Sequence, residues 1–140
     1  MTSGTAEEHG QATVLVIGLS LVVFAIAGLA VDGTRAFLLR RSLQSSADAA
    51  ALAAAAELDE AAYYASGGRV AVLDEPAARR SAAEWLQSRG LPLKAEVATA
   101  PDRVEVVVRA MVPTTFLGLA GITEIPVAAR ADASPIAGGP

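Results

Sequence analysis

The feature that most constrains this chain is an uncharged apolar run near its N-terminus, QATVLVIGLSLVVFAIAGLAV, which covers residues 11–31. A helix rises about 1.5 Å per residue, so this run spans roughly 30 Å, the hydrocarbon thickness of a bilayer. Of the last twenty residues, twelve are Leu, Ile, Val or Phe. Together they favour insertion by roughly 4–7 kcal/mol, at about 0.3–0.6 kcal/mol each. We therefore predict a membrane-spanning helix over residues 11–31, with the lipid bilayer as its partner.

Two other interpretations of this run are open. A cleaved secretory signal usually has a basic leader, whereas residues 1–10, MTSGTAEEHG, contain Glu7 and Glu8 but neither Lys nor Arg. The core helix of a soluble protein is usually apolar on one face, whereas this run is apolar on all sides. Residues 1–10 are predicted to be a polar leader or tail, in which the only histidine, His9, is solvated.

The arginines around the apolar run bear on its orientation. Arg35, Arg40 and Arg41 follow the run, and the preceding residues carry only acidic charges. By the positive-inside rule, this distribution places the C-terminal part of the chain in the cytoplasm.

Composition and motifs exclude several classes of function. The net charge of −4 argues against a nucleic-acid partner, which needs a basic face. The absence of cysteine excludes disulfides, thiolate metal sites and cysteine nucleophiles. The sequence contains no P-loop, GxGxxG, HExxH or GxSxG pattern. The acidic pair Asp59 and Glu60 lies at a helix end without partner residues. We expect no catalytic residue, no cofactor and no metal site, and we interpret the chain as a non-enzymatic protein.

Helix-favouring residues continue beyond the apolar run. Residues 32–62 contain no proline and only one glycine, Gly33. The simplest prediction is one continuous helix from about Gln11 to Ala62, in which residues 32–66 form a helical stalk. The alternative is a break at Asp32 and Gly33, with Asp32 capping a second helix. Asp32 can also form a membrane-exit pair with Arg35, one turn further on.

The stalk carries a stripe of small side chains. It has few charges, so we expect one of its faces to be covered by another element. The predicted packing face consists of Ala47, Ala50, Ala51 and Ala54, on which a sheet can approach closely. Alanine can also be present only for its helix propensity, and this second interpretation remains open.

A second, shorter helix is predicted after the sequence SGG at residues 66–68. Asp74 is a candidate N-cap, Pro76 suits the first turn, and Gly90 closes the helix. Its predicted inner face consists of Ala78, Ala82, Trp85 and Leu86. Trp85, the only tryptophan, is expected to anchor the core.

The hydrophobic period then changes from 3.6 to 2. Strands are predicted over residues 93–99, 103–112 and 123–133, with a turn at 100–102 and a short helix or turn in TTFLGLAG. Pro126 favours an edge position for the last strand. The predicted fold is α+β, with a long N-terminal helix, a small antiparallel sheet of about three strands, and one or two short helices. Residues 67–134 form the head and residues 135–140 a flexible tail.

Three segments carry a resemblance to a known family. HGQATVLVIG, GLAVDGTR and LLRRSLQSSADAAALAAA agree in order and spacing with the N-terminal region of TadE/TadG-like proteins of the Tad (Flp-type) pilus-assembly system. TTFLGLAGI and the strand end ARADA are also similar to such proteins. The resemblance implies a pilin-like, membrane-anchored minor or accessory pilus component. Its partners would be other Tad-type pilus or secretion proteins, with self-association as a further option. The rival hypothesis is a membrane-anchored binding or sensing module unrelated to pili.

The resemblance also implies an orientation and a processing position. The N-terminus would be cytoplasmic and the head extracytoplasmic, which opposes the arginine distribution. Prepilin-like members are cut after a glycine and have glutamate as the fifth mature residue. Here Gly10 would precede Gln11, but the fifth position is Leu15, so the chain departs from the pattern at that point.

Overall fold

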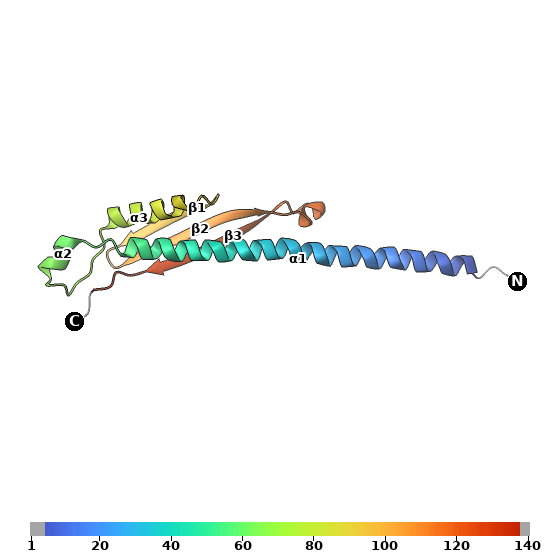
Figure 1. Ribbon diagram of the computed structural model, residues 1–140, viewed down its shortest axis with the longest axis horizontal. Coiled ribbons are helices and arrows are strands. Elements are labelled where there is room, and N and C mark those ends of the chain that lie inside the picture. The colour runs from blue at the N-terminus through green and yellow to red at the C-terminus, as the bar shows by residue number, and fades with distance from the viewer. Residues whose placement is uncertain (1–4, 138–140) are drawn as a thin grey trace.

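One helix dominates the molecule. The computed structural model describes residues 5–137, with side chains from residue 10 onward. Helix α1 runs from Thr5 to Ala55 without interruption, and Figure 1 shows it extending far beyond the rest of the chain. It passes through Asp32 and Gly33, so the alternative with a break and a capping Asp32 is wrong. No proline interrupts this stretch, and a single exposed glycine costs a helix only about 1 kcal/mol.

The helix ends earlier than the predicted boundary at Ala62, which is therefore wrong. Asp59 caps a separate short helix, α2 (Glu60–Ala65), and its carboxylate accepts a hydrogen bond from the Ala62 N–H at 3.0 Å. The backbone on either side of this excursion is also bridged. The Asp59 N–H donates to the Val72 carbonyl at 2.8 Å, and the Asp74 N–H donates to the Glu57 carbonyl at 2.9 Å. These bonds turn the chain away from the axis of α1.

Helix α3 (Glu75–Ser88) has the predicted boundaries. The Asp74 carboxylate caps it by accepting from the Ala77 N–H at 3.0 Å, Pro76 lies in its first turn, and Gly90 follows it with a φ of 61°. Its buried residues are Ala78, Ala82 and Leu86. They are spaced by four and so share one face of the helix.

The prediction that Trp85 anchors the core is wrong. Trp85 is 36% exposed and lies at the edge of the buried stripe formed by Ala78, Ala82 and Leu86. The guanidinium group of Arg89 lies over the indole, 4.9 Å from its centroid, in a cation–π contact.

Three antiparallel strands form the sheet. They are β1 (Lys94–Ala100), β2 (Arg103–Pro113) and β3 (Glu124–Ala133), in the order β1-β2-β3. All three predicted strands are confirmed to within one residue at each end. A 3-10 helix, η1 (Leu117–Ala120), lies between β2 and β3, where a short helix or turn was predicted. Pro126 lies in the edge strand β3, opposite Met111.

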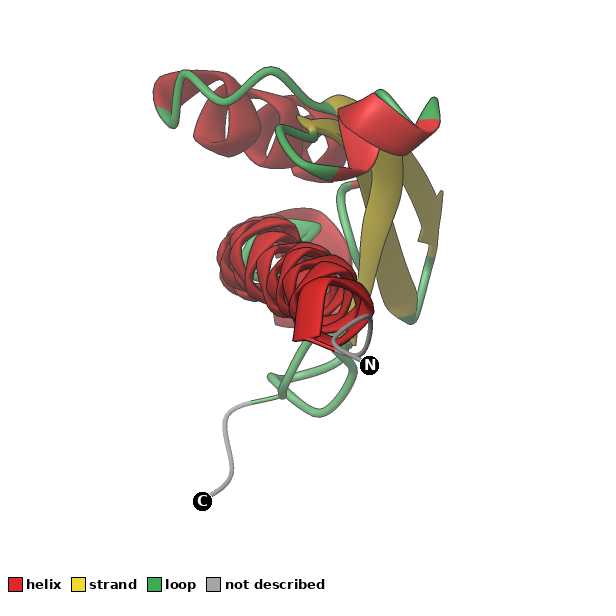
Figure 2. Ribbon diagram, turned by 90° about the vertical axis from the view of Figure 1, so that its right-hand side faces the viewer, coloured by secondary structure: helices red, strands yellow, loops and turns green. Residues whose placement is uncertain are grey.

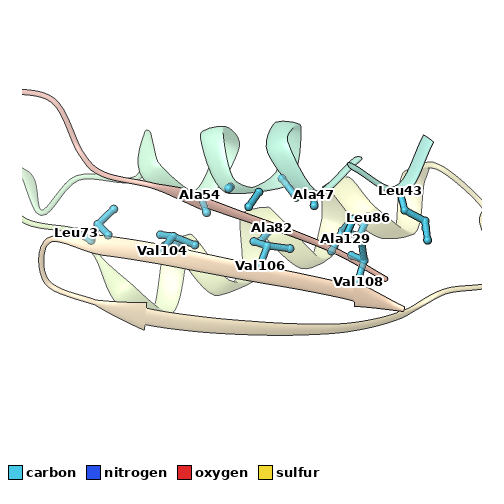
Figure 3. Close-up of a cluster of buried hydrophobic side chains, with 14 residues drawn as sticks. Leu43, Ala47, Ala54, Leu73, Ala82, Leu86, Val104, Val106, Val108 and Ala129 are labelled. Carbon is cyan, nitrogen blue, oxygen red and sulfur yellow. The ribbon is translucent and has the colours of Figure 1, made fainter. Parts of the chain in front are cut away.

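The core lies between one face of the sheet and the two longer helices. Val104, Val106 and Val108 of β2 alternate onto this face and are fully buried. Helix α1 packs on β2 and β3, while α3 packs on α1 and β1. Figure 2 shows both helices on the same side of the sheet, and Figure 3 shows the buried alanines of α1 facing the valines. The α+β fold prediction is confirmed.

The opposite face of the sheet is polar. Cross-strand ion pairs join Arg109 to Glu96 and Arg130 to Glu105, both at 2.6 Å. Because these pairs are largely exposed, each contributes at most about 1 kcal/mol to stability. The alternation therefore separates a dry face under the helices from a wet face.

Candidate functional site at the membrane exit of α1

The N-terminal half of α1 has almost no protein around it. Among the helices of the described residues, α1 is long and apolar enough to cross a membrane. Only 6% of its most apolar 18-residue segment is buried. The large apolar side chains of this segment are all exposed: Val14, Leu15, Val16, Ile17, Leu19, Leu21, Val22, Val23, Phe24, Ile26, Leu29 and Val31. Such a surface is suited to lipid, since the hydrocarbon core requires apolar side chains and an internally hydrogen-bonded backbone.

Asp32, the first residue after this segment, is buried and holds the β2–β3 loop (residues 114–123) against α1. Its exposed fraction is 1%. Its Oδ1 accepts the Thr115 N–H at 2.9 Å, and its Oδ2 accepts the N–H groups of Phe116 and Leu117, both at 2.8 Å. One carboxylate thus satisfies three consecutive backbone donors at the start of η1. Hydrogen bonds to a charged acceptor are among the stronger ones in proteins.

Arg35 contacts the same loop through a different group. Its Nη1 donates to the Thr115 hydroxyl at 2.7 Å. Asp32 and Arg35 do not form an ion pair with each other; the ion pairs of the described residues lie elsewhere. The predicted membrane-exit pair is therefore replaced by two side chains that bind one loop in parallel.

The donors around Asp32 also set its charge state. The N–H groups of Leu117 and then Thr115 do most to hold the pKa of this carboxyl below its ordinary value of 3.8, while burial acts in the opposite direction. The Phe116 N–H and the positive charge of Arg35 add to the lowering of the pKa. The carboxylate is consequently ionised at neutral pH, the form in which it accepts all three bonds.

Gly28, one turn before Asp32, lets the loop approach the helix backbone. A Cβ atom added at Gly28 would lie 2.6 Å from the Cβ of Phe116, closer than real contacts allow. At Gly18 and Gly33, by contrast, an added Cβ would meet nothing within 4 Å. Gly28, Asp32 and Arg35 are spaced by four and three residues, so they lie on one stripe of α1. This stripe is the seat of the β2–β3 loop.

The alanine stripe of α1 lies deeper in the head. Ala47, Ala50 and Ala54 are fully buried, and Ala51 is 1% exposed. Beside them, the Gln44 side-chain amide donates to the Arg130 carbonyl at 2.9 Å, which ties β3 to the helix. This face is occupied within the molecule. The surface that α1 offers to other molecules therefore consists of its apolar N-terminal half and of the sides of its second half that face away from the sheet, which expose Phe37, Leu38 and Leu52.

The other predicted positions do not form a site. Gly10 and Gln11 are both exposed within α1, near its N-terminal end. The side chain of His9 lies outside the described residues. Across residues 5–137, no group of three or more His, Cys, Asp or Glu residues is arranged to hold a metal ion.

Comparison with known proteins bears on the same helix. Residues 10–57 match the model of the family described as putative Flp pilus-assembly TadE/G-like. This region of the chain is therefore similar to the TadE/G-like family. The match confirms the resemblance found in the sequence. The TadE/G-like region includes the exposed apolar segment, Asp32, Arg35 and the alanine stripe, and it ends two residues after α1. No curated protein and no solved structure matches the chain.

Sequence reasoning missed the loop that completes this arrangement. The partners of Asp32 lie more than 80 positions away and contribute backbone N–H groups, which leave no mark in the sequence. One signal was present. Residues 110–123, AMVPTTFLGLAGIT, form the longest uncharged stretch outside the apolar run.

Proposed function

We propose that the protein is a non-enzymatic, membrane-anchored component of a Tad/Flp-type pilus-assembly or secretion system, in a minor pilin-like or accessory role. The observation that carries this proposal is the family match over residues 10–57, on a helix whose first half is bare and apolar. The second half of the same helix is built into the core of the head. A single-pass anchor that is continuous with its head suits a part that must be held at a membrane while it binds other proteins.

The proposed topology has a cytoplasmic N-terminus and an extracytoplasmic head. It follows the family resemblance and opposes the arginine distribution. Because the chain has no cysteine, the topology can be tested with one introduced thiol at Ile136, an 86% exposed residue that follows the head. A membrane-impermeant maleimide should label Ile136→Cys in cells whose outer envelope has been opened but whose cell membrane is unbroken. Labelling only after lysis would reverse the topology.

The apolar half of α1 is the proposed contact with other membrane helices, including those of Tad-type proteins or a second copy. Processing between Gly10 and Gln11 is a further part of the proposal. Mass spectrometry of the mature chain distinguishes the alternatives. A start at Gln11 supports pilin-like processing, an intact N-terminus supports an uncut anchor, and a start near Val31 would indicate secretion of the head.

The role in pilus assembly is tested by deleting the gene in its own host and scoring surface pili by electron microscopy. We expect pili to be lost or shortened and to return when the wild-type chain is supplied. Normal pilus number and length in the deletion strain, with the rest of the system expressed, would refute the assembly role.

A second candidate function, ligand binding or sensing by the head, is favoured by a recess on the wet face of the sheet. It encloses about 460 Å³ and is lined by Pro92, Lys94, Arg109, Met111 and Pro126, among others. Apolar walls beside Lys94, with Arg109 already paired to Glu96, would suit a small amphipathic anion. Normal pili in the deletion strain, together with a binding defect of Met111→Glu, would favour this candidate.

A further inference from the structure

The β2–β3 loop exposes large apolar side chains at the membrane end of the head. Leu119 is 88% exposed, Ile122 is 49% exposed and Phe116 is 42% exposed. No charged residue occurs between Arg109 and Glu124. A contiguous exposed apolar surface of this kind marks a contact with lipid or with another protein.

The loop lies beside the membrane-spanning part of α1. Phe116 packs on Gly28, which precedes Asp32 by four residues, or about 6 Å along the helix. A groove of about 560 Å³ is formed between Leu21, Phe24 and Leu29 of α1 and Phe116, Leu119 and Ala120 of the loop. Leu21 precedes Asp32 by eleven residues, or about 16 Å. Figure 1 shows η1 at the end of the sheet that faces the N-terminal half of α1. If residues 11–31 span the bilayer, the loop lies at the depth of its boundary.

Most backbone N–H groups of the loop donate hydrogen bonds within the protein, as a lipid environment requires. Asp32 satisfies the N–H groups of residues 115–117. The Thr114 N–H donates to the Thr123 carbonyl at 3.0 Å, and the Thr114 hydroxyl donates to the Ile122 carbonyl. The N–H groups of residues 119, 121 and 122 donate to carbonyls within the loop, at 3.0–3.1 Å. An irregular loop can enter the edge of the hydrocarbon only when its polar backbone groups are satisfied in this manner.

We propose that the β2–β3 loop is a second membrane contact, which inserts Phe116, Leu119 and Ile122 into the lipid boundary beside α1. Lipid is the occupant because the apolar surface of the loop is continuous with that of the membrane-spanning segment. Arg35, bound to Thr115, then lies at the level of the headgroups, where a cation is favoured by anionic lipid. Anchored at two points, the head rests directly on the bilayer.

The proposal rests on the membrane anchor of the proposed function, and the experiment separates the two. The chain has no cysteine, so a nitroxide spin label can be placed at one introduced thiol in the full chain. The three probe variants are Leu19→Cys in the predicted span, Leu119→Cys in the loop and Ile136→Cys near the C-terminus. Leu119 and Ile136 are matched in exposure, at 88% and 86%, so neither substitution removes core packing.

Each variant is reconstituted into phosphatidylcholine–phosphatidylglycerol vesicles. Collision of the label with oxygen, which concentrates in lipid, is compared with collision with a water-soluble nickel chelate. We expect oxygen to dominate at positions 19 and 119 and the nickel chelate to dominate at 136. Dominance of the nickel chelate at 119, with oxygen dominant at 19, would overturn the loop insertion alone. Low collision with both reagents at 119 would show that protein covers the loop and would also overturn it.

Dominance of the nickel chelate at both 19 and 119 would instead overturn the anchor on which the proposal depends. Ile122→Cys supplies a second loop position, which must report the same environment as position 119. Asp32→Ala, combined with Leu119→Cys, tests the role of the carboxylate. With three backbone donors of the loop released, we expect collision with the nickel chelate at position 119 to rise. No rise would overturn the role of Asp32 in holding the loop in the lipid.

Discussion

Replacing Ala50 with leucine should destabilise the head, because the sheet leaves no room for a larger side chain on this face of α1. Ala50 is fully buried in the cluster that contains Val104, Val106 and Val108. Three added carbon atoms must displace either the helix or the strands. Overpacking of a well-packed core costs about 1–3 kcal/mol. For a domain of about 100 residues, this corresponds to a decrease in Tm of roughly 4–8 °C for each kcal/mol.

The assay must report the head and not the anchor. In detergent, the membrane-spanning part of α1 stays helical after the head unfolds, since its backbone groups have no other partners there. Far-ultraviolet circular dichroism therefore combines the two parts. Trp85 is the only tryptophan and lies on α3, which packs against α1 and β1. Its fluorescence during heating follows the loss of that packing.

The matched control is Ser45→Leu, in the same helix but on its exposed side. We expect this variant to melt within about 0.5 kcal/mol of the wild type, as surface substitutions usually do. A second core variant, Ala54→Leu, should melt lower, like Ala50→Leu. If both core variants melted at the temperature of the Ser45→Leu control, the packing of the sheet on the alanine stripe would be refuted.

Three further predictions concern the seat of the loop and the anchor. Gly28→Ala should lower the Tm and increase proteolysis of the loop, because the new Cβ displaces the ring of Phe116. Gly18→Ala, at an open position, should do neither. Equal cleavage of both variants would contradict the contact between Gly28 and Phe116. Asp32→Asn should lower the Tm at neutral pH. Because the pKa of Asp32 is lower in the folded state, its carboxylate stabilises the fold fully above pH 3.8. This stabilisation is lost as the pH falls through the lowered pKa. The difference in Tm between wild type and Asp32→Asn should therefore close at low pH, and a difference independent of pH would contradict the role of its charge. Leu19→Arg combined with Val22→Arg should release the chain from membranes washed with carbonate, since two central arginines cost about 5–7 kcal/mol and offset the whole gain from the apolar run; retention in the membrane fraction would contradict the anchor.

Much of the fold was predictable because it depends on local patterns. The alternation of valines in β2 located the strand and its buried face, and Asp74, Pro76 and Gly90 located α3. The end of α1 was predicted too late. Asp59 has the chemistry of an N-cap but lies in a stretch without glycine or proline, and the bridge that turns the chain there joins residues 57–59 to 72–74. A contact between two distant segments cannot be inferred from the composition of either one.

The contact between the β2–β3 loop and α1 also could not be inferred from the sequence of either segment. Asp32 was recognised as unusual from its place at the membrane exit, but its partners are backbone N–H groups of a distant loop. Gly28 was seen as tolerated in lipid, whereas its role depends on the ring of Phe116, which is 88 positions away. Trp85 lies at the edge of the buried stripe of α3 and is partly exposed, which its helical spacing from Ala78 does not indicate.

The continuity of α1 from its apolar half into the head has a mechanical consequence. The described residues contain no break between the segment suited to lipid and the helix that packs on the sheet. Each residue advances a helix by about 100°, so inserting a single residue near position 30 would swing the sheet by more than a quarter turn around the axis. The direction in which the recess beside Met111 faces is therefore fixed by the neighbouring molecule that binds the apolar half of α1. A rotation of the apolar half of α1 about its axis would therefore turn the head with it.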